Sequence, residues 1–417
     1  MTWPAEPRPE WLRTVNAGDV LPLRLEADRP FEREVLMGEA ATALGWSLEE
    51  APWGADDFVE PLDLWLAELE ATARLTVFGR WFTRRFVLRL LQGRLLLDRY
   101  AHDDPGVADE PVVEPVFVVG APRTGTTLTH RLLAADPRLR APQGWELLHP
   151  VPPPTDATFE ADPRIGMADR ELSLPQLVSQ SLLDIHAYGG RMLKECLSAM
   201  SFAFRSEELI SRYHVPAYVE WLQGCDMASA YRMHRRVLQV LQRRMPGTRW
   251  VLKSPVHLHN LPTLLTVYPD ARLVFTHRDP LTVLASVSSL VANLRHAFSD
   301  HVDPVAIGRY HADLYCDSLD RLVDLADSGL LPAGRTAHVA YDALAADPAA
   351  AIAGAHGQLQ LTLDPAAADA LAAAASAAGR DHAAAHDYRF DDFGLDRGEC
   401  RARLARYADR FDVELAP

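Results

Sequence analysis

The sequence is poor in cysteine, and its four cysteines follow no metal or disulfide pattern. They are Cys196, Cys225, Cys316 and Cys400 in a chain of 417 residues. None of their spacings resembles a zinc or redox motif. Reduced, mostly buried thiols in a cytoplasmic protein are the simplest interpretation. We therefore predict no disulfide framework and no metal centre, and we expect a cytoplasmic protein.

The sequence also lacks a long uninterrupted hydrophobic run. The first twenty residues mix charges, prolines and tryptophans and contain no apolar signal core. The most lipophilic segment, Trp81 to Leu97, is interrupted by four arginines. A segment of this length and charge predicts an amphipathic helix, because it is too short and too polar to cross a bilayer. We expect no membrane span.

An excess of positive charge is missing as well, since the net charge is −15. Proteins that grip nucleic acid through its phosphates are usually basic, so nucleic acid is not expected as a partner. The hydrophobic share of 48% and charged share of 24% are those of an ordinary globular protein. This length fits one elaborated domain or two closely packed ones, and a homo-oligomer is compatible with it.

One stretch, Val116 to Thr127, carries the clearest chemical pattern. Its four leading apolar residues predict a buried strand of a parallel sheet. Glycines at positions 120 and 125 follow, and then leucines recur at helical spacing. In a strand, glycine loop and helix of this kind, unpaired N–H groups at the helix start point at an anion. The pattern favours anion binding over a solvated turn before a surface helix.

The loop differs from the nucleotide-binding P-loop. Its two glycines have the P-loop spacing, but Thr126 stands where the P-loop has lysine. In ATP-using enzymes that lysine meets the phosphates and the next hydroxyl holds magnesium. Arg123 is the loop's one cation. An arginine fork with nearby hydroxyls suits a tetrahedral oxyanion held without a metal; the hydroxyls are those of Thr124, Thr126 and Thr127.

Two later strands also end at a cation. Residues 249–252 form a short apolar strand before Lys253, and residues 272–276 form a second before His277 and Arg278. Each is followed by a cap-and-proline pair that predicts a helix start, Ser254-Pro255 and Asp279-Pro280. In an open α/β sheet these strand ends border the ligand crevice. We expect Lys253, Arg278 and the glycine loop to surround one anionic ligand.

The segment Gly-Ala-Pro-Arg-Thr-Gly-Thr-Thr-Leu, starting at Gly120, resembles the 5′-phosphosulfate loop of sulfotransferases that use 3′-phosphoadenosine 5′-phosphosulfate (PAPS). The most similar branch holds the tyrosylprotein sulfotransferases and their soluble bacterial relatives, and the resemblance covers residues 116–345 in motif order. It implies PAPS as cofactor, 3′,5′-ADP as product and no metal. It also implies transfer to a hydroxyl of a small molecule, lipid or glycan. The chain shows neither the membrane anchor nor the disulfides of tyrosylprotein sulfotransferases, so protein tyrosine is not implied.

The resemblance also implies roles for single residues. Lys253 matches a lysine that contacts the bridging oxygen, and Arg278 with Ser286 matches the 3′-phosphate site. Tyr341 is a looser match to a tyrosine that contacts the cofactor. The 5′-phosphosulfate would be bound by Arg123, which also acts in catalysis, and by Thr124, Gly125, Thr126 and Thr127.

Glu146 matches the position of the catalytic glutamate of tyrosylprotein sulfotransferases. Between Trp145 and Leu147 it could be desolvated, with its pKa raised toward working pH. The alternative is a structural carboxylate paired with an arginine. Cytosolic small-molecule sulfotransferases use histidine instead, so His149 and His257 are alternative bases. Candidates for closing over the nucleotide are His386, Tyr388 and Arg389.

The pattern and the resemblance together predict a P-loop-type, three-layer α/β/α fold with a mostly parallel central sheet. We expect a helical segment over residues 1–110, the α/β core over 111–345, and a C-terminal helical segment over 346–417 that completes the cofactor site. A helical insertion at about 165–245 carries aromatic residues that either line an acceptor pocket or pack the core. A P-loop kinase or NTPase, or a catalytically silent nucleotide-binding protein, are the alternative functions.

Overall fold

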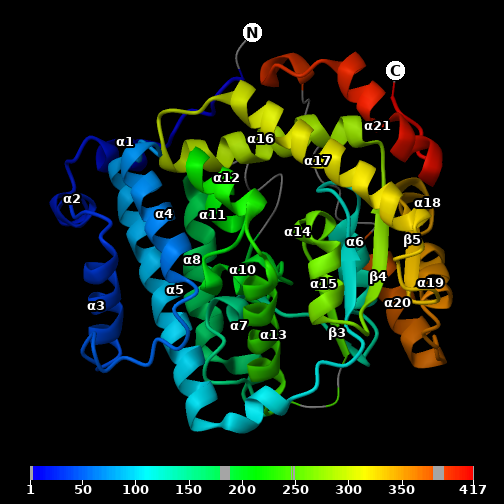
Figure 1. The fold of residues 1–417 in the computed structure, drawn as a ribbon, viewed down its shortest axis with the longest axis horizontal. Helices are drawn as coiled ribbons and strands as arrows, with labels where there is room; N and C mark the ends of the chain where they lie inside the picture. Colours follow the sequence, from blue (N-terminus) through cyan, green and yellow to red (C-terminus); the bar gives the residue numbers. More distant parts are fainter. Residues whose placement is uncertain (1–2, 179–187, 246, 248, 379–388, 417) are drawn as a thin grey trace.

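The computed structural model describes residues 3–178, 188–245, 247, 249–378 and 389–416. At its centre lies a five-stranded, fully parallel sheet in the order β2-β3-β1-β4-β5 (Figure 1). This confirms the predicted α/β fold with a parallel sheet. The strands are β1 Val116–Val119, β2 Leu139–Arg140, β3 Arg249–Lys253, β4 Arg272–His277 and β5 Thr336–Ala340.

Strand β1 is central because every residue in it is apolar and buried. Side chains of a strand alternate between the two faces of its sheet. Val116 and Val118 pack into one core cluster, and Phe117 and Val119 into another. The sequence pattern found four of the five strands. It missed β2, which has only two residues and leaves no periodic signal.

Helices cover both faces of the sheet, which gives the three predicted layers (Figure 1). On one face, α6 packs with the C-terminal helices α19 and α20. On the other, α13, α14 and α15 lie against the core that contains Phe117. These helices are α6 Thr126–Leu133, α13 Ala228–Gln242, α14 Val256–His259, α15 Leu261–Val267, α18 Tyr341–Ala346, α19 Pro348–Gln358 and α20 Pro365–Ala378.

The N-terminal segment is helical, as predicted, and shares a continuous core with the sheet and with the C-terminal helix. The proposed domain boundaries at residues 110 and 345 stay a prediction. The N-terminal helices are α1 Glu10–Asn16, α2 Leu21–Ala27, α3 Arg33–Ala43, α4 Val59–Ala71, α5 Val77–Asp103 and the 3-10 turn Pro105–Asp109.

The insertion is built of short helices between β2 and β3. They lie between the N-terminal helices and the sheet (Figure 1). Their bounds are α7 Gly144–Leu148, Phe159–Ala161 (3-10), α8 Pro163–Val178, α10 Leu197–Met200, Ser201–Ala203 (3-10), α11 Glu208–Ser211 and α12 Pro216–Gly224.

Two long helices, α16 Pro280–Phe298 and α17 Pro304–Asp327, cross over the carboxyl end of the sheet, and α21 Arg397–Phe411 packs on α17 after the turn Phe390–Phe393 (Figure 1). By length and composition, α16 is the one helix of the described ranges that could cross a membrane, and 72% of its apolar window is buried inside the fold. Trp81 to Leu97 lies within α5 and forms a helix, as predicted. It is not the most lipophilic segment, because it is less apolar than α16. The apolar character of α16 serves core packing between α5, α17 and α21.

Candidate functional site

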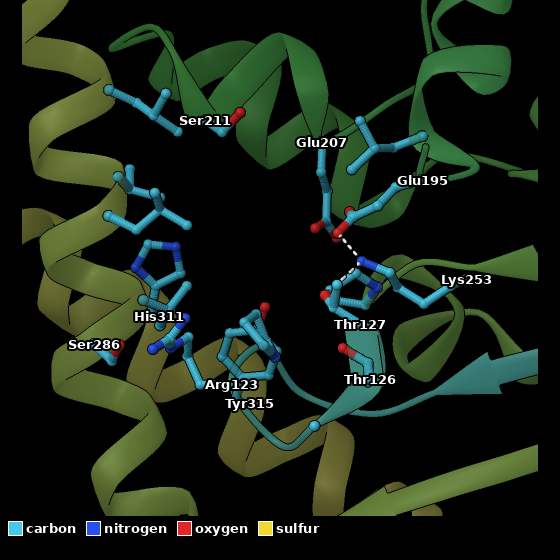
Figure 2. Close-up of a pocket in the computed structure, with 18 of the residues that line it drawn as sticks. Arg123, Thr126, Thr127, Glu195, Glu207, Ser211, Lys253, Ser286, His311 and Tyr315 are labelled. Carbon is cyan, nitrogen blue, oxygen red and sulfur yellow. Dashed lines mark hydrogen bonds and ion pairs between the residues drawn. The ribbon is translucent and has the colours of Figure 1, made fainter. Parts of the chain in front are cut away.

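A cavity of about 1130 Å³ lies at the carboxyl ends of the central strands. The residue that ends or follows β3, β4 and β5 lines it in each case: Lys253, Arg278 and Tyr341. The loop after β1 lines it too. Because the strands are parallel, their carboxyl ends meet at one edge and bring these side chains together. Of the predicted site residues, the cavity contains Arg123, Gly125, Thr126, Thr127, Lys253, Arg278, Ser286 and Tyr341 (Figure 2).

The loop after β1 turns its backbone toward the cavity. Arg123 and Gly125 both have left-handed backbone angles, with φ of 67° and 88°. Helix α6 begins at Thr126, and no side chain caps its first N–H groups. Successive N–H groups in such a turn form a concave anion site, and the helix dipole adds to the attraction. The loop therefore has the geometry of a phosphate or sulfate cradle.

Gly125 is needed for both its backbone angle and its lack of a side chain. An alanine Cβ at this position would lie 2.8 Å from Leu344 Cδ2, in the left-handed region. We expect Gly125→Ala to cost about 1–2 kcal/mol of stability from the backbone angle alone. It should also weaken binding of 3′,5′-ADP, because the loop must shift. Denaturant unfolding and calorimetry would check both effects, with Gly354→Ala as the control. Gly354 lies within α19 and has open space around it, so this change should not weaken either property.

Thr124 is the one predicted loop hydroxyl that does not line the cavity. Its Oγ1 lies 2.7 Å from the carbonyl oxygen of Ala121 and 2.6 Å from Thr276 Oγ1. Thr276 belongs to β4. Thr124 therefore fastens the loop to the neighbouring strand. The structure places it behind the anion site, where it positions the groups that face the cavity.

Lys253 projects from the end of β3 into the cavity and is only 3% exposed. Its Nζ donates to Glu195 Oε1 at 2.5 Å and to Thr127 Oγ1 at 3.3 Å (Figure 2). The backbone N–H of Cys196 also donates to the carbonyl of Lys253, at 3.0 Å. These contacts fasten the segment before α10 to the sheet and place a carboxylate directly beside the lysine.

Glu195 was missed from the sequence, because it sits in no motif and follows no strand. One signal could have found it. Lys194 and Lys253 are the only lysines of the chain, and the other 40 of its 42 basic residues are arginines. Both lysines line the cavity. Lysine is a compact, strongly hydrated point charge that arginine does not replace, so the two positions pointed to special chemistry around residue 194.

Arg278 contacts both the loop after β1 and the residue that follows β5. Its Nη1 donates to the carbonyl oxygen of Arg123 at 2.8 Å, and its guanidinium lies 4.0 Å from the ring centroid of Tyr341. Asp279 caps α16 by accepting from the N–H of Leu281 at 2.9 Å, as its cap position predicted. About two helical turns after Asp279, the buried Ser286 Oγ has no hydrogen-bond partner among the described residues. An oriented donor of this kind fits a bound anion.

Glu146 does not line the cavity. It is fully buried on α7, where its carboxylate pairs with Arg140 and accepts the N–H of Gln143 at 2.9 Å in a capping box. Burial raises its pKa, as expected from the sequence, although Arg140 opposes the shift. Two cation–ring contacts complete this cluster, with Arg140 4.5 Å from the Trp250 ring. The geometry corresponds to the structural alternative, a carboxylate paired with an arginine.

The two alternative histidines lie outside the cavity as well. His149 Nε2 contacts Glu171 Oε1 at 2.9 Å. His257 is completely buried, bonds the Tyr231 hydroxyl at 2.9 Å, and has a pKa far below its usual value because of burial. It is a core histidine whose buried Nε2 has no hydrogen-bond partner among the described residues. Neither His149 nor His257 lines the cavity.

The structure describes one of the three C-terminal candidates, Arg389. His386 and Tyr388 lie outside the described residues. Arg389 is exposed and does not line the cavity. The C-terminal residues that line it include Phe390 and Arg397, which the sequence reasoning missed. Their position depends on the packing of α21 against α17, which no local pattern encodes.

Apolar side chains from helices α5, α11, α16 and α17 also line the cavity, and we call them its apolar wall. They include Phe82, Ile210, Leu290, Val291, Leu294 and Leu314. Polar side chains of the same helices, among them Ser211, Arg295 and His311, line the cavity as well. Of the insertion aromatics, Tyr188 lines the cavity. Phe202, Phe204, Tyr213 and Tyr218 are core residues instead. Of these five aromatic residues, one therefore lines the cavity and four pack the core.

Comparisons with known proteins agree with this geometry. Residues 115–365 match the model of a sulfotransferase family. The chain is similar to the crystal structure of sulfotransferase STF1 from Mycobacterium tuberculosis, with 30% identity, a TM-score of 0.77, and coverage of 91% of this chain and 98% of the other. The structure of sulfotransferase STF9 from Mycobacterium avium gives 29% identity and a TM-score of 0.81, covering 93% and 98%.

A curated relative from Mycobacterium bovis, the omega-hydroxy-beta-dihydromenaquinone-9 sulfotransferase Stf3, is 28% identical over 255 residues. That match covers 58% of this chain and spans 62% of the relative's length. The family match covers more than half of the chain and includes β1 and its loop, Lys253, Arg278 and Tyr341. The protein belongs to the sulfotransferase family.

Proposed function

We propose that this enzyme transfers a sulfuryl group from PAPS to a hydroxyl of a small-molecule or lipid acceptor that has an apolar body. The observation that carries the proposal is the composition of one cavity. Cations and hydroxyls from three separate segments of the chain line it together with apolar side chains from four helices. The volume of about 1130 Å³ exceeds that of most single-ligand pockets, so a nucleotide and an acceptor can share it.

The donor fits the cations by its chemistry. PAPS supplies an activated sulfuryl group and, in 3′,5′-ADP, a good leaving group. The uncapped start of α6, with Arg123 and the Thr126 and Thr127 hydroxyls, would bind the 5′-phosphosulfate. Arg278 and the unpartnered Ser286 Oγ would bind the 3′-phosphate, with Tyr341 beside them.

Lys253 and Glu195 then have complementary tasks. Lys253 donates hydrogen bonds to the bridging oxygen as negative charge develops there. In doing so it leaves Glu195, which becomes available to take the proton of the acceptor hydroxyl. One O–S bond forms, the bridging S–O bond breaks, and the proton passes to Glu195. Glu146 takes no part in this scheme, since it does not reach the cavity.

Two observations support an apolar acceptor over a glycan. The apolar wall of the cavity consists of leucine, isoleucine, valine and phenylalanine side chains, which offer a sugar few hydrogen-bond partners. The relative Stf3 is named for an omega-hydroxylated menaquinone, an alcohol on an apolar lipid. A hydroxyl at the end of an apolar chain can reach Glu195 with the chain against this wall.

Nucleotide binding is the first experiment. Calorimetry should show 3′,5′-ADP binding more tightly than ADP, and more tightly than ATP with magnesium. A preference for ATP with magnesium would contradict the proposal and favour the P-loop kinase alternative. The second experiment follows labelled sulfur from PAPS onto primary alcohols of increasing chain length and onto sugars. Transfer to sugars alone would overturn the acceptor assignment, and inactivity on every acceptor despite tight 3′,5′-ADP binding would favour the silent protein.

Replacing Arg278 should remove the preference for the 3′-phosphate. We expect Arg278→Ala to weaken 3′,5′-ADP binding by about 10–100-fold, the usual range for losing a hydrogen bond to a charged group. Binding of 5′-AMP should change much less, because it lacks the 3′-phosphate. Calorimetry with both nucleotides measures the difference, and Arg309→Ala, an exposed arginine of α17 outside the cavity, is the control. Equal losses for both nucleotides would mean that Arg278 serves only to hold the Arg123 loop.

A further inference from the structure

Four glutamates line the cavity, Glu171, Glu195, Glu207 and Glu208, and Glu207 has no task in the scheme above. In Figure 2 it points from the turn before α11 toward the same corner as Glu195, beside Lys253. Its side chain is 23% exposed, so it is open to the cavity and still largely desolvated. An anion site that contains two neighbouring carboxylates needs an explanation, because both would repel a nucleotide with phosphates at each end.

The environment of Glu207 favours its neutral form. Its Oε1 lies 3.5 Å from Nε2 of His259, on α14. Nε2 is buried and has no hydrogen-bond partner among the residues that the structure describes. An unpartnered ring nitrogen aimed at a carboxyl group is either a donor to a carboxylate or an acceptor for a carboxylic acid. The rest of the histidine decides between the two.

The other side of the His259 ring identifies its tautomer. Nδ1 lies 2.5 Å from the Ser318 hydroxyl, and that hydroxyl donates its one hydrogen to the carbonyl oxygen of Leu314 at 2.6 Å. With that hydrogen on Leu314, Ser318 accepts from Nδ1, and this bonding pattern assigns the ring hydrogen to Nδ1. Burial lowers the pKa of His259 to about 3, so the ring is neutral and Nε2 is an acceptor in this tautomer. A protonated Glu207 can donate to Nε2, whereas a carboxylate cannot.

We propose that Glu207 is a positioning residue that carries a proton shared with His259, and that this proton is what allows the cavity to accept an anionic nucleotide. With Glu207 neutral, Glu195 is the single carboxylate beside Lys253. Lys253 can then turn from Glu195 to the bound PAPS, and only one negative charge, that of Glu195, repels the PAPS. The inference rests on the proposed function, because it concerns the same nucleotide site.

The charge state of Glu207 responds to pH near neutrality. Burial, and then the charge of Glu195, raise its pKa to about 7. Its other titratable neighbours keep one charge state there: His259 has its pKa lowered to about 3, and burial raises the pKa of each neighbouring tyrosine. Those tyrosines are Tyr231 on α13 and Tyr310 and Tyr315 on α17. His311 on α17 also lines the cavity, and burial lowers its pKa to about 3.

The sign of the effect follows from linkage. A bound nucleotide adds negative charge to the cavity and raises the pKa of Glu207 further. Above pH 7 the complex therefore holds more protons than the free enzyme, and affinity must fall as pH rises. Below pH 7 both forms are protonated and this contribution is constant. The phosphates of the nucleotide titrate near pH 6 and affect all variants alike.

The test is calorimetry of the full chain with 3′,5′-ADP between pH 6 and pH 9, in pairs of buffers with different ionisation enthalpies. For the unaltered protein we expect net proton uptake above pH 7 and an affinity that falls by up to about tenfold per pH unit. Glu207→Gln keeps a neutral group that can donate to His259, so it should bind at the low-pH affinity and show no uptake from this site. Glu195→Gln should move the midpoint to lower pH, since the charge of Glu195 contributes to the raised pKa.

Glu171→Gln is the matched control, another glutamate of the same cavity. Burial opposes its ionisation, but the hydrogen bond from His149 and the charge of Arg89 lower its pKa overall, so it does not titrate above pH 7. The control should keep the pH dependence of the unaltered protein. An unchanged pH dependence in Glu207→Gln, or no proton uptake by the unaltered protein, would overturn the inference while leaving the proposed function intact. No binding of 3′,5′-ADP at any pH would reject the proposed function and this inference with it.

Discussion

Replacing Lys253 with methionine is expected to lower kcat by about 10²–10³-fold, the usual cost of removing one preorganised donor to a developing negative charge. Affinity for 3′,5′-ADP should change far less, because the bridging oxygen becomes charged only as the sulfuryl group departs. Methionine keeps the length of the side chain at a position that is almost fully buried. Single-turnover transfer and calorimetry of the same preparation would separate the two effects.

The ion pair with Glu195 complicates that result and also provides its control. Removing Lys253 leaves Glu195 beside the cavity without the cation that lies 2.5 Å from it. The double variant Lys253→Met with Glu195→Gln restores neutrality. If the pair serves only to hold the segment before α10 on the sheet, the double variant should recover activity relative to either single change. Full loss of turnover in the double variant supports separate chemical roles.

Replacing Glu195 with glutamine should lower kcat by about 10²–10⁴-fold, the range expected for removing a general base. The amide still accepts a hydrogen bond from Lys253, so the segment before α10 should stay in place. The buried ammonium loses its counter-charge, so the melting temperature should fall, and turnover is compared in the folded fraction. Transfer to an alcohol that works well with the unaltered protein measures the loss. Unchanged turnover in Glu195→Gln would remove this residue from the mechanism.

Glu146→Gln is the contrasting variant. It breaks a fully buried ion pair with Arg140 and half of a capping box. Breaking a buried pair by neutralising one partner costs about 3–5 kcal/mol, since the other charge stays buried. We expect a lower melting temperature with kcat nearly unchanged in the folded fraction. A large kcat loss without loss of stability would return Glu146 to the role that the family resemblance suggested.

The catalytic role of Glu146 stays a prediction, and there is a physical reason why the structure favours the structural alternative. From the sequence, a glutamate between two bulky apolar residues predicts desolvation, and the structure shows it: Glu146 is completely buried and its pKa is raised. Desolvation is equally a property of catalytic and of structural carboxylates. Which of the two applies depends on what lies within reach, and Arg140, six residues earlier, was close enough in sequence to have favoured the structural alternative.

The sequence did not predict that Glu195 and Glu207 reach the cavity. Neither follows a strand, neither belongs to a motif, and both lie in a helical insertion whose pattern indicates only packing. They reach the cavity because the insertion folds back on β3, where the N–H of Cys196 bonds the carbonyl of Lys253. Contacts between residues so distant along the chain leave no periodic trace, so local patterns cannot predict them.

Local sequence patterns were enough to predict four of the five strands, the glycine loop after β1, and the cations at the ends of β3 and β4. These features are local: hydrophobic runs, glycine angles and cap residues act over a few neighbouring positions. Tertiary structure alone decided which carboxylate faces Lys253, which aromatic residues line the cavity, and where the apolar wall stands. Those outcomes depend on long-range packing, which sets burial and charge at each site through partners that are distant along the chain.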